Sequence, residues 1–283
     1  MVFGGLACRA VTLPVQAPIC YCVVMRKLFS TIGRYALLFM RGYGEMIIFM
    51  IETLKAFRKI PFYLPQIVEQ YRYIEQKSRS LIIATGAFMG LVLGVQIGTQ
   101  IVSGTPTWVE GGLILRAVLL EMGPIILSLI LAGRVGSGIA AELGAMQVTE
   151  QIDALRVMAV NPIEFLVMPR VVAGLIAVPV LIIYGDLVSI MSGFFSSYFT
   201  IHLRWSGFVK GMRRSFLPTD VYTSIIKGVV FGAIIISFGA YFGMHSRRGA
   251  KGVGTATTQA FVWSALAVIV LDYVISSALF FIW

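Results

Sequence analysis

Five long apolar stretches constrain this sequence more than any other feature. They cover residues 80–103, 111–133, 171–200, 221–244 and 257–283. A helix needs about 20 mainly apolar residues to cross a hydrocarbon core about 30 Å thick. The composition agrees, because 58% of the residues are apolar, only 13% are charged and the mean hydropathy is +0.88. The sequence therefore predicts an all-α integral membrane protein with five membrane-spanning helices.

The excess of basic residues fits a membrane protein better than a nucleic-acid-binding one. Lys and Arg number 23 against 13 Asp and Glu, a net charge of +10. The apolar stretches leave no extended basic face, whereas basic loops beside anionic lipid explain the excess. With the N-terminus cytoplasmic, most Lys and Arg residues fall on the inner side, and only Arg204, Lys210, Arg213 and Arg214 fall outside. The positive-inside rule therefore predicts a cytoplasmic N-terminus and a C-terminus on the outer side.

Residues 1–24 are predicted to be an unstructured or non-native extension. The segment is broken by Pro14 and Pro18, and it makes neither a signal peptide nor a membrane span. A start at Met25 is an alternative.

Residues 25–79 are predicted to form amphipathic helices that lie in the membrane interface, and residues 80–283 to form the domain of five spans. Charged residues interrupt each apolar run of the first segment, which favours a helix along the membrane over one across it. Pro61 and Pro65 are expected to redirect the chain. The alternative is a sixth span over residues 35–54. The interrupting charges are Arg34, Arg41, Glu45, Glu52 and Lys55.

No catalytic or metal-binding set can be assembled from the sequence. Cys8, Cys20 and Cys22 lie far from His202 and His245, so no zinc-site spacing occurs. The glycine-rich segments 133–138 and 249–255 lack the Lys-Ser or Lys-Thr pair of a phosphate loop, and no metalloprotease or serine-hydrolase motif occurs. We therefore expect no metal, no cofactor and no ATP hydrolysis by this chain itself.

Glycine recurs at every fourth residue of the first span. Gly86, Gly90, Gly94 and Gly98 place a smooth groove along one helix face, against which another backbone can pack closely. This contact lies either within one subunit or across a dimer interface or lipid path.

Several charged residues fall within the apolar stretches, where they mark cavities or pathways. Glu121 and Lys227 lie at similar depth in the outer half of the membrane, so we expect them to pair and to line a cavity. Arg116 lies nearer the outer edge of the membrane. The alternative is a snorkelling Lys227 and a protonated Glu121 in the core. Asp186 and Asp272 are expected to be satisfied by backbone or hydroxyl partners such as Ser189 and Ser276.

The loop between the second and third spans contains a short amphipathic pattern. Its apolar face predicts a cytoplasmic helix over residues 149–160, closed by Asn161 and Pro162. This helix is either an ordinary surface helix or a plug that docks into a cytosolic partner. The apolar face consists of Val148, Ile152, Leu155 and Ala159.

From residue 34 to the C-terminus, the sequence resembles the MlaE family of ABC-transporter permeases, called YrbE in actinobacteria. These proteins are the membrane subunits of MCE-type lipid transporters. The resemblance rests on an ordered series of motifs: 120–124 (LEMGP), 132–137 (AGRVGS), 141–146 (AELGAM), 150–155 (EQIDAL), 158–162 (MAVNP), 169–170 (PR), 264–268 (SALAV) and 271–273 (LDY).

The resemblance implies a fold, a site and a set of partners. It implies an interfacial N-terminal helix, five spans, and a homodimer with a lipid cavity that Glu121 and Lys227 face. Leu120 departs from relatives that carry an arginine there, which changes the charge of the cavity. The residues assigned to coupling with the ATPase, including three from the loop helix itself, are Glu142, Gly144, Glu150, Asp153, Leu155 and Pro162.

The implied partners are cytosolic ABC ATPase subunits, an MCE-domain protein, a small STAS-domain protein and membrane phospholipid, with no nucleic acid. The expected location is a bacterial inner membrane, with plastid or other envelopes as alternatives. The function predicted is therefore a lipid permease driven by a separate ATPase. The alternative from another class is a stand-alone ion-coupled carrier in which Glu121 and Asp272 take up protons.

Overall fold

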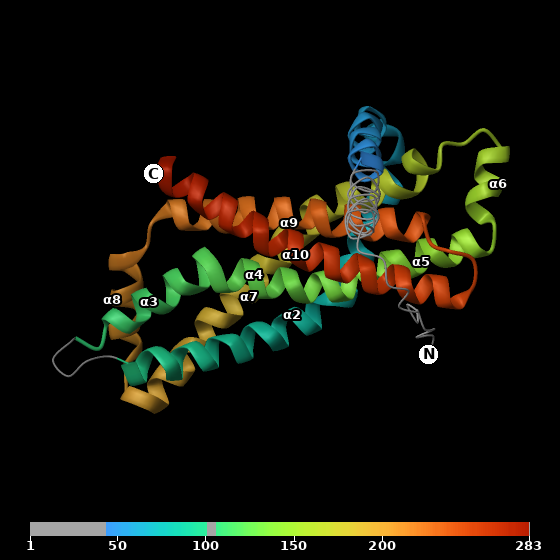
Figure 1. Ribbon diagram of the computed structural model, residues 1–283. Helices are drawn as coiled ribbons and strands as arrows, with labels where there is room; N and C mark the ends of the chain where they lie inside the picture. The colour runs from blue at the N-terminus through green and yellow to red at the C-terminus, as the bar shows by residue number, and fades with distance from the viewer. Residues whose placement is uncertain (1–43, 101–105, 283) are drawn as a thin grey trace, which may run out of the picture. The chain divides into compact units, whose positions relative to one another are not determined.

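The computed structural model describes residues 44–100 and 106–282, and over residues 280–282 it describes the backbone alone (Figure 1). The chain divides into two compact units, Met1–Phe49 and Met50–Trp283. Of the first unit, the described residues 44–49 are helical. The predicted extension over residues 1–24, its cysteines and the first part of the alternative sixth span lie outside the described residues. Everything below concerns the second unit.

Every regular element in the described part of the second unit is helical, which confirms the predicted all-α membrane fold. Five of its helical runs are long and apolar enough to cross a membrane. The first run ends in α2, after residues 50–56 and the 3₁₀ turn η1; the second joins α3, η2, α4, η3 and α5; the third joins η4 and α7; the fourth and fifth are α9 and α10. The bounds are η1 Phe57–Tyr63, α2 Leu64–Gln100, α3 Val109–Ala117, η2 Val118–Met122, α4 Gly123–Leu131, η3 Ala132–Gly136, α5 Ser137–Val148, α6 Gln151–Val157, η4 Ile163–Val167, α7 Met168–Ile201, α8 Trp205–Ser215, α9 Pro218–Met244 and α10 Ala250–Ile282.

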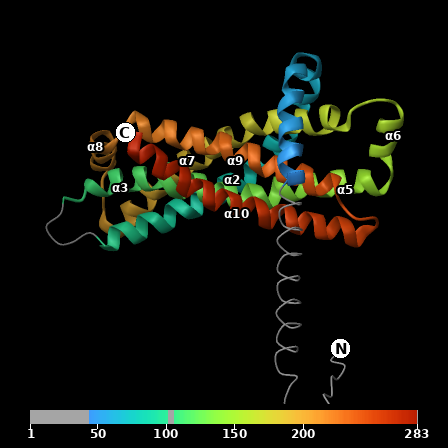
Figure 2. The ribbon, with the colours of Figure 1, turned by 45° about the horizontal axis from the view of Figure 1, so that its top comes forward.

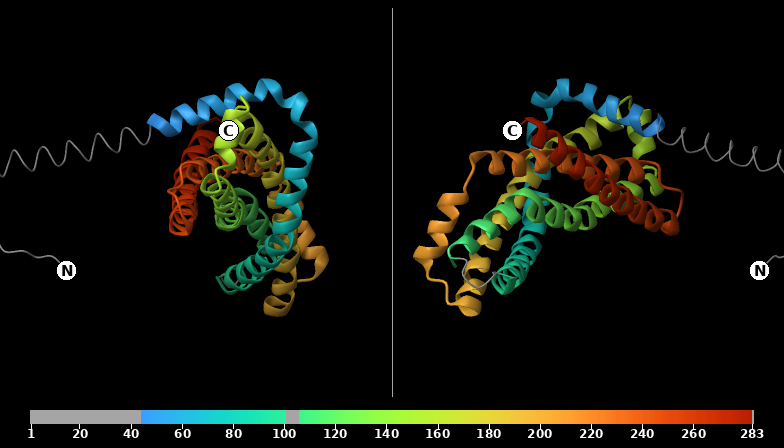
Figure 3. Two further views of the ribbon diagram at one scale, coloured as in Figure 1. Left: turned by 90° about the vertical axis from the view of Figure 1, so that its right-hand side faces the viewer. Right: turned by 60° about the vertical axis from the view of Figure 1, so that its left-hand side comes forward.

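The chain changes direction at η1, where the sequence predicts a bend. Pro61 lies inside this 3₁₀ turn, and the helix before it runs in a different direction from α2 (Figure 3). α2 then begins at Leu64 and continues through the first apolar stretch. Residue 80, the predicted start of the first span, is therefore not an element boundary. A position of residues 50–63 in the membrane interface stays a prediction.

The predicted glycine groove of α2 packs against α7 within the same chain. A methyl group added at Gly90 would meet the carbonyl oxygen of Ser189 and the hydroxyl of Ser192. One at Gly86 would lie 2.7 Å from the carbonyl oxygen of Gly185. Residue numbers rise together along the two helices, so α2 and α7 run parallel, as expected of the first and third spans. Of the two readings of the groove, the structure shows the contact within one subunit.

α9 makes close glycine–backbone contacts of the same kind with two neighbouring elements, α7 and η3. Gly232 approaches the carbonyl oxygen of Gly174 in α7, and Gly239 approaches that of Gly136 in η3. Without a hydrophobic driving force between helices in lipid, such close backbone contacts supply the packing energy. Figures 1 and 2 show the result: α3 and α8 lie at one end of the bundle, and α5 and α6 at the other.

Substituting Gly90 by alanine should destabilise the protein, because the new methyl group would overlap α7 backbone. Overpacking of this kind typically costs about 1–3 kcal/mol. The midpoint of thermal unfolding in detergent should fall by several degrees. Gly254→Ala in α10 is the matched control, since a methyl group there meets nothing within 4 Å. If neither variant lowered the unfolding midpoint, this packing would be contradicted.

Candidate functional site

A cluster of three charged side chains joins the second, fourth and fifth spans. The Lys227 ammonium in α9 lies 2.8 Å from Asp272 Oδ1 in α10 and 3.3 Å from Glu121 Oε2 in η2. The Lys227 side chain is fully buried, whereas 46% of the Glu121 side chain is exposed. The predicted pairing of Glu121 with Lys227 is therefore present. The snorkelling alternative is not, because the ammonium points into the protein.

The local backbone of the second span contributes to this cluster. Residues Val118–Met122 form a π-helical turn, in which the Gly123 N–H bonds to the Val118 carbonyl oxygen. Lys227 Nζ donates a hydrogen bond of 2.6 Å to the Leu120 carbonyl oxygen. π-turns leave backbone groups without their usual helical partners and are frequent at functional sites. The Lys227 ammonium thus has two carboxylates and one carbonyl oxygen around it.

The prediction for Asp272 is wrong. It was expected to pair with a hydroxyl such as Ser276, but it binds Lys227 directly, and Ser276 donates its hydrogen bond to Glu121 Oε1 at 3.0 Å. Ser276 lies one turn beyond Asp272 on α10, so both side chains reach the same place from one helix face.

Asp186 does have a hydroxyl partner, as predicted, although it is not Ser189. Ser224 of α9 donates a hydrogen bond to Asp186 Oδ2 at 3.0 Å. The pair connects α7 with α9, deep in the bundle, where both side chains are buried.

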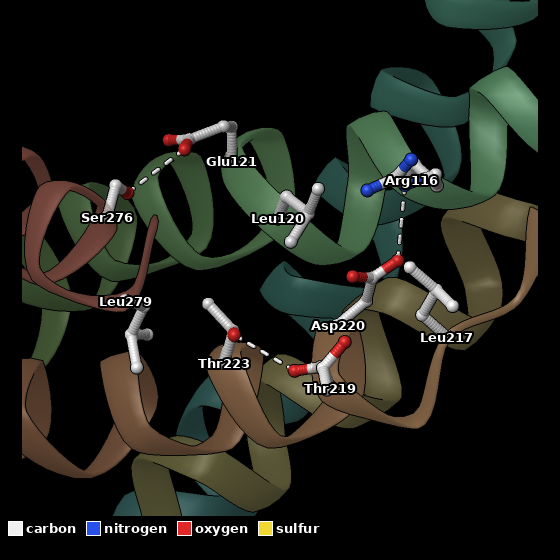
Figure 4. Close-up of a pocket in the computed structure, with 9 residues that line it drawn as sticks. All are labelled: Arg116, Leu120, Glu121, Leu217, Thr219, Asp220, Thr223, Ser276 and Leu279. Atoms are coloured by element: carbon white, nitrogen blue, oxygen red, sulfur yellow. Dashed lines mark hydrogen bonds and ion pairs between the residues drawn. The ribbon is translucent and has the colours of Figure 1, made fainter. Parts of the chain in front are cut away.

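A pocket of about 430 Å³ opens beside the Lys227 cluster (Figure 4). We call it the Arg116 pocket. Its lining combines charged, hydroxyl and leucine side chains from the second span, the start of α9 and the fifth span. The lining residues are Arg116, Leu120, Glu121, Leu217, Thr219, Asp220, Thr223, Ser276 and Leu279.

The lining of the Arg116 pocket differs in two respects from the residues expected there. Lys227 is not among the residues that line this pocket, and its buried ammonium contacts Glu121 Oε2. A contact between Lys227 and a ligand stays a prediction. The fifth span also contributes side chains, Ser276 and Leu279, that the sequence reasoning left out. Arg116 and Leu120 line the pocket, and their place in a lipid cavity stays a prediction.

Asp220 is a pocket residue that the sequence reasoning missed. Its Oδ2 lies 3.3 Å from Arg116 Nε, and its side chain is almost fully buried. Asp220 stands in the first turn of α9, where a carboxylate is favoured by the helix dipole. The signal available was an acid just after Pro218, a helix-start pattern at the same membrane depth as Arg116.

The predicted coupling residues lie at the other end of the second span and in the loop after it. Arg170 Nη2 of α7 lies 2.7 Å from Glu142 Oε1 of α5, so an ion pair joins these two helices. Gly144 is buried beside Val253 and Ser246. Arg170 was quoted as part of a motif, but its pairing was not predicted.

The loop helix α6 is shorter than predicted and covers Gln151–Val157 instead of residues 149–160. Glu150 and Ala159 have φ values of +58°, which end the helix on both sides. The Val160 N–H bonds to the Leu155 carbonyl oxygen and the Ala159 N–H to that of Arg156, which is a Schellman C-cap. Sequence gives little warning of this, because neither residue is a glycine.

The apolar face of α6 is also only partly buried. In the predicted face, Ile152 is fully buried, Val148 and Leu155 are half-buried, and Ala159 is exposed. Outside that face, Val157 and Met158 are 88% and 65% exposed. Asp153 Oδ1 pairs with Arg156 Nη1 at 3.1 Å on the exposed side, and Pro162 is buried where the loop enters η4. The loop therefore presents two apolar side chains and a charged pair on its surface.

Lys59 and Glu164 form a further contact that the sequence did not predict. Lys59 Nζ of η1 lies 2.6 Å from Glu164 Oε2 of η4. The rings of Tyr63 and Phe165 meet edge-on beside them, with centroids 6.3 Å apart. The bend before the first span is thereby attached to the start of the third.

Within the described residues, no group of three or more His, Cys, Asp or Glu side chains is arranged to hold a metal ion.

Comparison with known proteins places this arrangement in a family. The family model described as Permease MlaE matches residues 67–278. A Rickettsia prowazekii protein named as a probable ABC transporter permease is 33% identical over 257 residues, covering 91% of this chain and 99% of the relative. The Haemophilus influenzae intermembrane phospholipid transport system permease protein MlaE is 29% identical over 89% of this chain and 97% of its own length. The Arabidopsis thaliana chloroplastic protein TRIGALACTOSYLDIACYLGLYCEROL 1 is 35% identical over 75% of this chain and 61% of its own length.

Removing the charge of Lys227 should destabilise the bundle, because Glu121 and Asp272 would lose their shared counter-ion. Breaking a buried ion pair from one side costs about 3–5 kcal/mol, which corresponds to a fall of roughly 10 °C in the unfolding midpoint. Lys227→Met should show this fall in detergent, and adding Asp272→Asn should recover part of it. Lys251→Met, which removes an exposed ammonium, is the control. Equal midpoints for Lys227→Met and the control would show that the cluster contributes nothing to stability.

Proposed function

This chain belongs to the MlaE permease family, and from that premise we propose that it is the membrane subunit of an ATP-driven lipid transporter. In this proposal it moves phospholipid, or a related lipid, between the inner membrane and a periplasmic MCE-domain protein. The relatives named above are ABC transporter permeases, and one is named for phospholipid transport.

The observation that carries the proposal is the Arg116 pocket. A phospholipid needs charged groups for its head and apolar surface for its chains. The pocket offers Arg116 and Glu121 beside Leu217 and Leu279, within helices long enough to cross a membrane. Charged side chains in such helices are costly and commonly mark a substrate pathway.

The loop around α6 is the proposed contact with the ATPase. It exposes Val157 and Met158, and its neighbour α5 is joined to α7 through Glu142 and Arg170. A force applied to the loop would therefore act on the second and third spans together. Because the chain lacks a phosphate-loop motif, ATP hydrolysis is assigned to a separate subunit.

The assembly that we propose follows the family. It contains two copies of this chain, two ATPase subunits, an MCE-domain protein and a small STAS-domain protein. The positive-inside count places the N-terminus and the α6 loop in the cytoplasm and the C-terminus in the periplasm. A bacterial inner membrane is the proposed location.

Reversing the charge of Asp153 should uncouple ATP hydrolysis from lipid movement. Its side chain is partly exposed and pairs only with the neighbouring Arg156 among the described residues, so Asp153→Lys changes the loop surface and spares the core. In proteoliposomes with the complete complex, ATP-dependent lipid movement should fall at least about tenfold, as expected when an interface charge becomes repulsive. Glu69→Lys makes the same charge change on the exposed side of α2. Lipid movement at the wild-type rate in Asp153→Lys would exclude this loop as the coupling site.

Affinity purification of the tagged chain from detergent-solubilised membranes should recover a phosphate-loop ATPase, an MCE-domain protein and phospholipid. Mass spectrometry of the eluate identifies all three. The stand-alone ion-coupled carrier is not favoured by the family or by the relatives. It would regain support if the chain alone moved substrate under a proton gradient, without ATP or a second polypeptide.

A further inference from the structure

The Arg116 pocket has a positive group at one end of its lining. Arg116 Nε pairs with Asp220, but 47% of the Arg116 side chain is exposed. No other acceptor among the described residues contacts this guanidinium, and Arg116 belongs to the lining of the pocket (Figure 4). Guanidinium nitrogens in this arrangement bind phosphate oxygens well.

The pocket also has a negative group, and the Lys227 cluster explains why it is not neutralised. One ammonium faces two carboxylates in this cluster, so the cluster carries one negative charge when all three groups are ionised. Lys227 and Asp272 are buried, whereas Glu121 is nearly half exposed and lines the pocket. Glu121 is therefore the carboxylate of this cluster that a ligand in the pocket can reach.

Arg116 and Glu121 together disfavour a headgroup that carries only negative charge. Arg116 and Asp220 offset each other, and Glu121 adds a negative charge to the lining. A lipid phosphate can bind Arg116, but a second negative or a neutral group beside it gains nothing from Glu121. A positively charged group beside the phosphate gains a charge-assisted hydrogen bond.

The other lining residues favour an ammonium that still carries hydrogens. Among the described residues of the lining, Thr219, Thr223 and Ser276 provide hydroxyls, and none is aromatic. A primary ammonium has three donors for carboxylate and hydroxyl oxygens. A quaternary ammonium has none and is usually recognised by aromatic rings.

We propose that the Arg116 pocket selects phospholipids with a primary ammonium in the headgroup, with the phosphate on Arg116 and the ammonium on Glu121. This inference rests on the proposed lipid transport and adds its substrate class. Glu121 is the residue that determines specificity, Arg116 binds the phosphate shared by all phospholipids, and the three leucines of the lining contact the glycerol and chain region.

The test uses the full chain, purified with its partners in nanodiscs that contain equal parts of phosphatidylethanolamine, phosphatidylcholine and phosphatidylglycerol. Lipids that remain bound after delipidation are extracted and quantified. Phosphatidylethanolamine should be enriched about tenfold over each of the other two, the difference expected for one charge-assisted hydrogen bond. Equal retention of the three lipids, or preference for phosphatidylglycerol, would overturn the proposal.

Two variants separate the proposed roles. Glu121→Gln should abolish the preference for phosphatidylethanolamine while phospholipid stays bound. Arg116→Gln should lower the retention of all three lipids and leave their ratio unchanged. Glu69→Gln, which removes an exposed carboxylate from α2 outside the pocket, is the matched control and should behave as the wild type.

A second measurement needs no variant, which matters because Glu121 also contacts Lys227. Wild-type protein is offered phosphatidylethanolamine and its mono-, di- and trimethylated forms. Retention should fall as N–H donors are replaced by methyl groups, whereas a flat series would overturn the proposal. Retention of phospholipid without headgroup preference would leave lipid transport standing. Absence of any bound phospholipid, together with no ATP-dependent lipid movement, would overturn lipid transport as well.

Discussion

The burial of the Lys227 ammonium is the constraint on which the candidate site depends. An ammonium inside a membrane helix needs counter-charges and acceptors from the protein, because neither water nor lipid chains supply them. Here those groups come from two other spans: Glu121 and the Leu120 carbonyl from the second, and Asp272 from the fifth. Satisfying one side chain therefore brings three helices together. It also leaves Glu121 in the lining of the pocket, where we propose that it binds the headgroup ammonium.

Close backbone packing holds the remaining helices around that cluster. α7 approaches α2 through the small residues of both helices and approaches α9 at Gly174 and Gly232. Buried polar pairs add to these contacts: Ser224 donates to Asp186 between α9 and α7, and Ser197 donates to Glu110 between α7 and α3. In lipid, association of helices relies on such packing and hydrogen bonds. α7 thus serves as the support on which the second and fourth spans are positioned.

Sequence predicted those features that depend on composition or on depth along a helix. The five apolar stretches gave the spans, and the similar depth of Glu121 and Lys227 gave their pairing. What sequence could not give is the rotation of one span against another, which decides that Asp272 binds Lys227 and that Ser276 binds Glu121. Nor could it give the ends of α6. Glu150 and Ala159 have φ values of +58°, and a positive φ is hard to predict where the residue is not glycine. A pairing such as that of Arg116 with Asp220 could be predicted only once the packing of the helices is known.

The second span explains how a pocket and a distant loop can belong to one mechanism. It is helical from Val109 to Val148, 40 residues, which at 1.5 Å per residue is roughly 60 Å, about twice the hydrocarbon thickness. Glu121 and Glu142 stand about 30 Å apart along it, a separation close to one hydrocarbon thickness. Movement of the loop can reach the pocket through this one continuous element. The π-turn at Val118–Met122 contains Glu121, and the π-turn at Ala132–Gly136 lies between Glu121 and Glu142. Such turns are frequent at functional sites.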